Sequence, residues 1–414
     1  NNTAVGGSAL RANTTGASNT AVGHASLTAN TTGYENIALG KDAMLSNTTG
    51  FRNTSVGFSS MNGNTTGESN TALGRGALEA NTTASNNTAV GKSALQANTT
   101  GTPNTAVGSK ALFTATTASN NTALGYQAMY SVTDGSHNVA VGHNALSSLT
   151  GHAYNTAVGV AALESTVNAH ANTAVGYKAM NVNSSGANNT AVGFEARRAN
   201  TTGSNGTSLG YKAGEAVTTG NDNTCIGVES GAYGVDITDG TRNICIGNYS
   251  HTSSPGGYDQ IVLGYNVQGS SHTTLTFGNG GSDTTCSFGA TSWSAPSDQR
   301  LKEEITTATA GLSFVNDLRP VTFKWKKEKD IPTDLAGYKE GSETRFKTDT
   351  TEHGFIAQEV KTAIDAHSEI KDGFDMWSED DNGRQRLADS SLVPMLVKAI
   401  QELSTKNDAL EARI

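Results

Sequence analysis

Asn-Thr-Ala-Val-Gly at residues 19–23 is the stretch that decides the fold, because close variants of it recur at a fixed spacing. The closing glycine returns every 17 residues from Gly6 to Gly227, and two further copies end at Gly247 and Gly264 after a three-residue insertion. A short period kept over so many copies is typical of stacked turns that contact only their neighbours. The pattern therefore predicts a mainly β fold, a parallel β-roll or β-solenoid over residues 1–264.

Each copy has the pattern of a short strand followed by a turn. The residue before the glycine is aliphatic, the second before it is small and the third before it is β-branched, as in Val22, Ala21 and Thr20. Such alternation is typical of a strand with one face in a core. We expect a narrow core with one of these aliphatic residues per turn, plus the Leu or Met that follows the glycine, such as Leu10 or Met44.

Many copies continue with Asn-Thr-Thr-Gly, first at residues 13–16. Asn and Gly are expected to supply the positive φ angles of a tight turn. Stacked copies would place Asn above Asn, about 4.8 Å apart, and form ladders of side-chain hydrogen bonds. The triplet also matches the glycosylation sequon, but turn chemistry explains it better in so regular a repeat.

The composition excludes several classes of protein. Hydrophobic residues make up only 35% of the chain, and disorder would be an alternative if the period were less strict. The net charge of −9 gives no support to a nucleic-acid partner, and the sequence has no apolar run long enough for membrane insertion. The chain begins inside a repeat without Met, so we expect residues upstream, including an attachment region.

Residues that could carry chemistry are sparse in the repeats. Cys225 and Cys245 occupy the small position of the strand, which favours buried small residues over a metal or redox role, and Cys286 lies beyond the repeats. The nine histidines occur singly, and no pair of carboxylates recurs at a plausible site. We therefore expect no metal, no cofactor and no glycan-cleaving site.

The period breaks after Gly264, and two further regions follow. Short alternating segments at 273–278 and 284–289 predict strands, so residues 265–296 are interpreted as a β neck. From Ser297 onward charged residues become frequent and helical periodicity begins. Residues 297–414 are therefore predicted to form a small α+β domain.

Ordered blocks of this last region carry a family resemblance. The blocks at 297–302, 312–325, 353–360 and 392–403 resemble the C-terminal intramolecular chaperone of phage tailspikes and fibres, the endosialidase-type or peptidase S74 domain. Ser390 is a departure, because the family commonly has an aromatic residue there. The N-terminal repeats resemble the head β-rolls of trimeric autotransporter adhesins and, more closely, repeats of phage tail fibres.

The resemblance implies self-cleavage by a serine–lysine dyad, which corresponds to Ser297 and Lys302. Ser297 Oγ would attack the carbonyl of Pro296 and form an ester that water hydrolyses, which would cut the chain between these two residues. A serine needs a base to remove its proton, and that role would belong to Lys302. At most, the chain would act once on itself as an endopeptidase.

A purely structural role for this hexapeptide is the alternative. Ser297 or Asp298 would cap a helix that contains Leu301 and Ile305, and Lys302 would lie on its surface.

The final segment, 391–414, has the spacing of a coiled-coil helix. One heptad position holds Val393, Ile400, Asn407 and Ile414, and the other holds Leu396, Leu403 and Leu410. This order leans toward dimers in isolated coils, whereas the resemblance implies three chains. A core helix within one chain is the alternative.

Together the resemblances imply a homotrimeric phage tail fibre in the virion tail that binds a host cell-surface receptor, either a glycan or a surface protein. The alternative is a bacterial trimeric surface adhesin with the same repeats, at the bacterial cell surface. Variable residues that follow the repeat glycines, including Tyr126, Tyr177, Phe194 and Tyr211, could form a surface for glycans or could be a solvated face.

Overall fold

The structure is a computed structural model that describes residues 1–290, 293–294, 297, 299–333, 335, 337–380 and 383–413. Its chain divides into two compact units, residues 1–297 and residues 298–414, which we describe separately.

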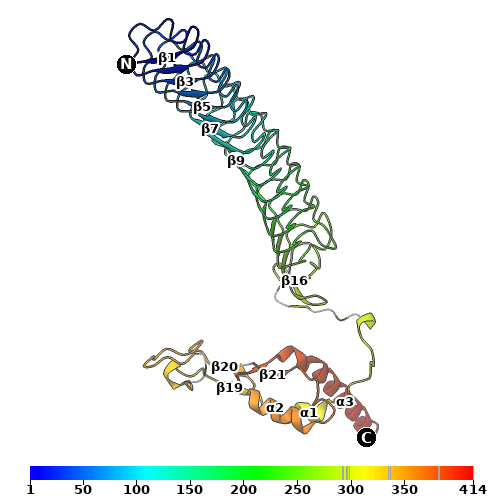
Figure 1. Ribbon diagram of the computed structural model, residues 1–414. Coiled ribbons are helices and arrows are strands. Elements are labelled where there is room, and N and C mark those ends of the chain that lie inside the picture. The colour runs from blue at the N-terminus through cyan, green and yellow to red at the C-terminus, as the bar shows by residue number, and fades with distance from the viewer. Residues whose placement is uncertain are drawn as a thin grey trace. The chain divides into compact units, whose positions relative to one another are not determined.

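The first unit is a β-solenoid, in which one short strand per turn joins a single parallel sheet (Figure 1). Thr3, Ala4 and Val5 pair in register with Thr20, Ala21 and Val22, and the same register continues along the unit. The predicted stack of 17-residue turns is therefore confirmed. The strands are β1 Thr3–Val5, β2 Thr20–Val22, β3 Ile37–Leu39, β4 Thr54–Val56, β5 Thr71–Leu73, β6 Thr88–Val90, β7 Asn104–Val107, β8 Asn121–Leu124, β9 Val139–Val141, β10 Thr156–Val158, β11 Thr173–Val175, β12 Thr190–Val192, β13 Thr207–Leu209, β14 Thr224–Ile226, β15 Ile244–Ile246 and β16 Ile261–Tyr265.

The sheet continues past the last repeat glycine. Strand β17, Thr274–Asn279, pairs parallel with β16, and β18, Ser282–Ser287, pairs antiparallel with β17. These strands lie close to the two predicted for the neck.

The prediction that the aliphatic strand residues lie in the core is wrong. The small residue lies inside, so Ala21 is fully buried, whereas Val5 and Leu73 are 57% and 47% exposed. Strand alternation places neighbouring residues on opposite faces. The interior is already filled by the turn residues after each glycine, such as Ala43 and Met44, and only a small strand residue fits beside them.

The predicted asparagine ladders are confirmed. In the Asn-Thr-Thr-Gly turns, Asn47 Nδ2 donates to Asn30 Oδ1 at 2.7 Å, one turn away. In a second ladder before each strand, Asn36 N donates to Asn19 Oδ1 at 3.0 Å and Asn36 Nδ2 donates to Gly50 O at 2.9 Å. Because the Asn47 amide is buried and bonded, its triplet serves the fold rather than a glycan.

The explanation of the Asn-Thr-Thr-Gly glycines by positive φ is also wrong. Gly16 lacks a positive φ, and an ideal Cβ there would lie 2.1 Å from Gly33 O of the next turn, so the close approach of turns favours glycine. Positive φ occurs instead at the strand-ending Gly23 and at Ala25 and Leu27 in the following turn. Tertiary stacking overrides the ordinary reluctance of Ala and Leu to adopt it.

The second unit is a small α+β domain. Its core contains Phe314, Val360, Ile364, Met376 and Met395. Its helices are α1 Leu312–Asp317, α2 Ala357–Ala366 and α3 Val393–Glu411, with 3-10 turns η1 Gln299–Leu301, η2 Glu328–Asp330 and η3 Asp389–Leu392. Two antiparallel pairs complete it, β19 Val321–Phe323 with β20 Glu352–Gly354 and β21 Trp377–Glu379 with β22 Gln385–Leu387.

Candidate functional site

The predicted dyad lies on an exposed segment. Ser297 and Lys302 flank the 3-10 turn η1, and Lys302 N donates to Gln299 O at 3.1 Å. Pro296, on the other side of the predicted cleavage bond, lies outside the described residues. The dyad therefore stays a prediction.

The α-helix that the alternative role requires is absent among the described residues, and Asp298, one of its two proposed caps, lies outside them. No α-helix forms between residues 299 and 311, all of which are described. Leu301 is 71% exposed and Ile305 is 63% exposed, so neither anchors a helix within this chain. Exposed aliphatic side chains on a segment without regular structure are instead available to a partner surface.

Helix α3 has two apolar faces. Met395 and Ala399 are buried on one face, and Glu402 Oε2 accepts a hydrogen bond from Leu312 N at 3.0 Å, which holds the start of α1 against α3. The alternative of a core helix within one chain accounts for this face only, and the coiled coil stays a prediction. The other face holds the described heptad residues, all exposed: Val393, Leu396, Ile400, Leu403, Asn407 and Leu410. Ile414 lies outside the described residues.

A longer apolar surface runs along the solenoid, and we call it the aliphatic column. It consists of the strand residues before the repeat glycines, which point outward, one per turn. Its members are Val5, Val22, Leu39, Val56, Leu73, Val90, Val107, Leu124, Val141, Val158, Val175, Val192, Leu209, Ile226, Ile246 and Leu263, and none is buried. A contiguous apolar surface of this length is typical of a protein interface.

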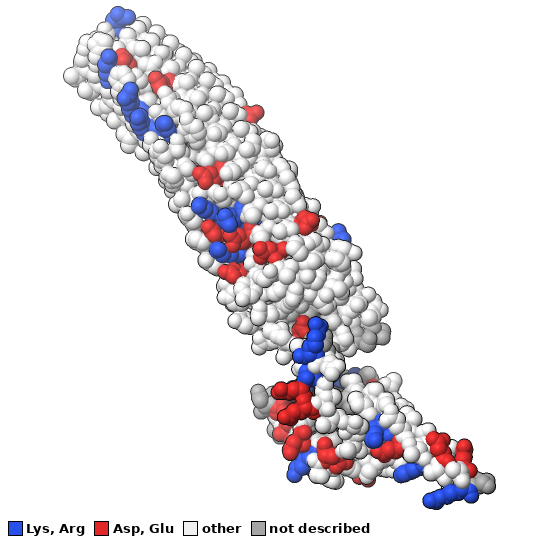
Figure 2. Space-filling view, turned by 90° about the vertical axis from the view of Figure 1, so that its right-hand side faces the viewer, with Lys and Arg blue, Asp and Glu red and all other residues white. Residues whose placement is uncertain are grey.

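The variable residues after the glycines stack on one another. Tyr177 and Phe194 have ring centroids 5.1 Å apart, and Phe194 and Tyr211 have centroids 5.4 Å apart. Because the 17-residue turn superposes them, each ring covers the face of the next, and the ring edges remain for contacts with solvent or ligand. Charged residues are few on the solenoid face that Figure 2 shows.

The sequence did not indicate that His367 lies in a cluster with carboxylates, because one of its partners is distant in the sequence. Its Nε2 lies 2.8 Å from Asp317 Oδ2 and its Nδ1 lies 3.0 Å from Glu369 Oε1. Hydrogen bonds to Asp317 and then Glu369 raise the pKa of His367. The ring also packs edge-on against Phe314, so this cluster fastens the end of α1 to the chain after α2. No sequence signal joins residues 50 positions apart.

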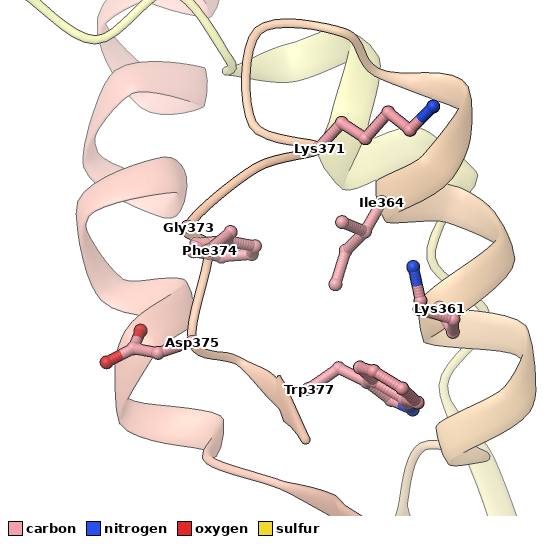
Figure 3. A pocket seen from close by; sticks show the side chains of 7 residues that line it. All are labelled: Lys361, Ile364, Lys371, Gly373, Phe374, Asp375 and Trp377. Carbon is pink, nitrogen blue, oxygen red and sulfur yellow. The ribbon is translucent and has the colours of Figure 1, made fainter. Parts of the chain in front are cut away.

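A surface hollow lies beside α2 in the second unit (Figure 3). Ile364, Phe374 and Trp377 supply its apolar lining, and Lys361 Nζ lies 5.0 Å from the centre of the Trp377 ring. Lys371, Gly373 and Asp375 complete the lining, which contains no serine, cysteine or histidine. The described residues contain no cluster of His, Cys, Asp and Glu able to hold a metal ion. Cys225 and Cys245, adjacent in the sheet, are buried free thiols, as predicted.

A β-solenoid of 17-residue turns followed by a domain that matches residues of a chaperone family fits a fibre-type or tailspike-type protein. Residues 297–368 match the family described as chaperone of endosialidase, peptidase S74, so the second unit contains a domain of this family. The match ends at 368, whereas the predicted resemblance extends to 414. Comparisons with curated proteins and with solved structures found no match.

The chaperone domain indicates an extracellular fibre-type protein. Within the described residues, no helix has both the length and the apolar character needed to cross a membrane.

Proposed function

We propose that this chain is one subunit of a homotrimeric phage tail fibre. Its solenoid is the shaft or head that contacts a host surface receptor, and its C-terminal domain is an intramolecular chaperone that assembles three chains. The proposed location is the virion tail.

The aliphatic column is the observation that carries this proposal. A single chain leaves at least one aliphatic side chain per turn in contact with water, all on the outer face of one sheet. Burying one half-exposed Val or Leu side chain in an interface contributes about 1 kcal/mol to the free energy of association. The column runs the length of the stack, so the occupant that fits it best is another copy with the same repeat. The number three comes from the chaperone domain and the repeat resemblance rather than from the column itself.

The exposed heptad face of α3 supports the same assembly from the other unit. Ile400, 65% exposed, and Leu403 lie on this face with the other heptad residues. Three such helices would bury these side chains together, and Asn407 would fix their register.

A chaperone is needed because the turns are nearly identical. Chains displaced by one 17-residue turn would pair almost as well as aligned chains, so the solenoid alone specifies alignment weakly. A C-terminal domain that joins three chains at one level would remove this ambiguity. Cleavage before Ser297 would then release the domain and make assembly effectively irreversible.

A bacterial trimeric surface adhesin with the same repeats is the alternative. It shares the trimer and differs in location. Antibodies to residues 1–264 would label phage tails on the first proposal and the bacterial surface on the second.

The test is the mass of the full chain in solution, measured by light scattering. We expect three times the chain mass, and a monomer would contradict the proposal. Leu73→Lys combined with Leu124→Lys should prevent trimer formation, because both residues lie in the aliphatic column. Thr83→Lys is the matched control, since Thr83 is exposed outside the column.

Cleavage is tested on the same preparations by denaturing gels and mass spectrometry. We expect two fragments divided before Ser297 in the wild type and intact chains in Ser297→Ala and Lys302→Ala. An intact trimeric wild type would instead make the domain a retained assembly cap and would remove Ser297 as a nucleophile.

A further inference from the structure

One turn of the solenoid has a charged residue in its interior. At the fourth position after the repeat glycine, the preceding turns have Leu or Met, such as Leu163 and Met180, and these side chains are buried. The turn that begins at Gly193 has Arg197 there, also fully buried. Among the described residues, no carboxylate forms an ion pair with it. A buried charge without a counterion is costly, so this substitution requires a compensating contact.

The compensating contact replaces a missing asparagine amide. In regular turns the asparagine before the strand donates to a carbonyl 14 residues later, as Asn189 Nδ2 does to Gly203 O at 2.9 Å. The next turn has Gly206 at this position and therefore no amide to reach Gly220 O. Arg197 Nη2 donates to Gly220 O instead, at 3.1 Å. The guanidinium thus makes the hydrogen bond that an asparagine at 206 would make.

Gly206 is as necessary to this arrangement as Arg197. A Cβ at residue 206 would lie 2.2 Å from Arg197 Nη1 and 2.3 Å from Arg197 Cζ, so no side chain fits there beside the guanidinium. The backbone of Gly206 keeps its place in the ladder, because its N–H donates to Asn189 Oδ1 at 2.9 Å. Arg197 and Gly206 are therefore two complementary departures from the repeat.

The buried guanidinium costs the solenoid stability, because part of it lacks hydrogen bonds. Arg197 Nε and Nη1 have no hydrogen-bond partner, and burial lowers the pKa of Arg197 to about 10, which leaves it cationic at neutral pH. It also divides the apolar interior, since one buried cluster ends at Ala196 and the next begins at Ala213. Buried polar groups with such costs are known to specify register in other folds.

We propose that the Arg197–Gly206 pair excludes those displaced registers of the solenoid in which the extruded 17-residue turn contains only one of the two residues. Where asparagine meets asparagine, a chain displaced by one turn regains the same hydrogen bonds. Here, displacement in one direction would place Arg197 against Asn223, where a side chain already occupies the space. Displacement in the other direction would place Met180 beside Gly206 and leave Gly220 O without its donor. The proposal concerns one chain and does not depend on trimer formation.

The test is refolding of the full chain from denaturant with Arg197→Met, Gly206→Asn and the two combined. Each single change should lower the yield of folded protein, Gly206→Asn by about tenfold or more because of the clash. The double variant has the regular repeat and should regain the yield. If the two single losses add in the double variant, the residues do not act as a pair and the proposal fails.

Register is measured on the refolded chains by limited proteolysis and mass spectrometry. A displaced chain extrudes one 17-residue turn, which becomes a cleavage site. We expect several-fold more of this cleavage in the double variant than in the wild type, despite equal yields. Leu163→Arg with Asn172→Gly, added to the double variant, moves the pair two turns upstream and should suppress cleavage of extruded turns that contain only one of residues 163 and 172. Equal cleavage in the double variant and the wild type would overturn the proposal.

Discussion

The two units handle buried polar groups differently. In the solenoid, each buried asparagine of a ladder bonds to its equivalent one turn away, as Asn121 does to Asn104. In the second unit, His367 is held by Asp317, 50 residues away, through a contact made once. The same contact, repeated in many turns, stabilises the first unit. Long-range contacts that each occur once stabilise the second. Changes in the solenoid should therefore have effects that the repeat predicts, and changes in the second unit should depend on individual partners.

The largest loss of stability is expected at a strand-ending glycine, where two turns lie in close contact. Gly125 has φ +141°, and a Cβ there would lie 2.4 Å from Gly142 O. Gly125→Ala should destabilise the solenoid by at least about 3 kcal/mol or prevent folding, because strain and overlap act together. Denaturant unfolding followed by circular dichroism measures this. Gly281→Ala is the control, since no atom lies within 4 Å of a Cβ at that residue. Equal midpoints for the two variants would contradict the close approach of turns.

A smaller effect is expected for one rung of a ladder. Asn121 Nδ2 donates to Gly135 O, and Asn121 Oδ1 accepts from Asn138 N. Asn121→Ala should cost about 2–4 kcal/mol, because both backbone groups lose their partner in a buried site. The same unfolding measurement applies. Asn168→Ala, at an exposed position, should change stability little, and a similar loss in both variants would mean that the ladder contributes nothing special.

The stability of the second unit should depend on pH through His367. The pKa of His367 is raised, so the folded domain favours its protonated form. Its contribution is complete below the ordinary histidine pKa of about 6.5 and is lost as the pH rises through the raised value. Hydrogen exchange of α1 and α2 should therefore accelerate as the pH rises above about 6.5, after correction for the intrinsic rate. His367→Gln should abolish this dependence, and its persistence would assign it to another group.

The smallest change in stability is expected at the end of an asparagine ladder. Asn98 Oδ1 is buried without a hydrogen-bond partner, because the next turn has Ala115 instead of asparagine. Ala115→Asn would bond to Asn98 and place its own unpaired oxygen against Val132. The unpaired atom moves by one turn, so stability should change by less than about 1 kcal/mol. A large gain in the unfolding midpoint would show that the ladder ends are not equivalent.

The period alone was enough to predict the stacked turns and the asparagine ladders. The period did not decide which strand face is interior. Strand alternation places Ala21 and Val22 on opposite faces but does not say which of the two faces the core. The turn after each repeat glycine decides which face is interior, because its residues, such as Leu27, already fill the core. Likewise, Arg197 and Gly206 are visible as departures from the repeat, but they form a pair only once the 14-residue hydrogen bond is known.

The candidate site shows a different limit. The sequence around Ser297 identified the domain family, and residues 297–368 match it. A helix through Leu301 and Ile305 did not form, because helical spacing without an apolar surface to cover gives little stability in one chain. The two side chains of the predicted dyad remain to be tested by cleavage.

The aligned turns also have a consequence for the gene. Seventeen codons encode one complete turn with both of its contact surfaces, so unequal recombination between repeats adds or removes whole turns in frame. Each such event changes the length of the solenoid by about 4.8 Å without creating an unmatched surface. The length of the solenoid can therefore change in fixed increments. A deletion that separates Arg197 from Gly206 is the exception, and selection should confine length variants to the turns on either side of this pair.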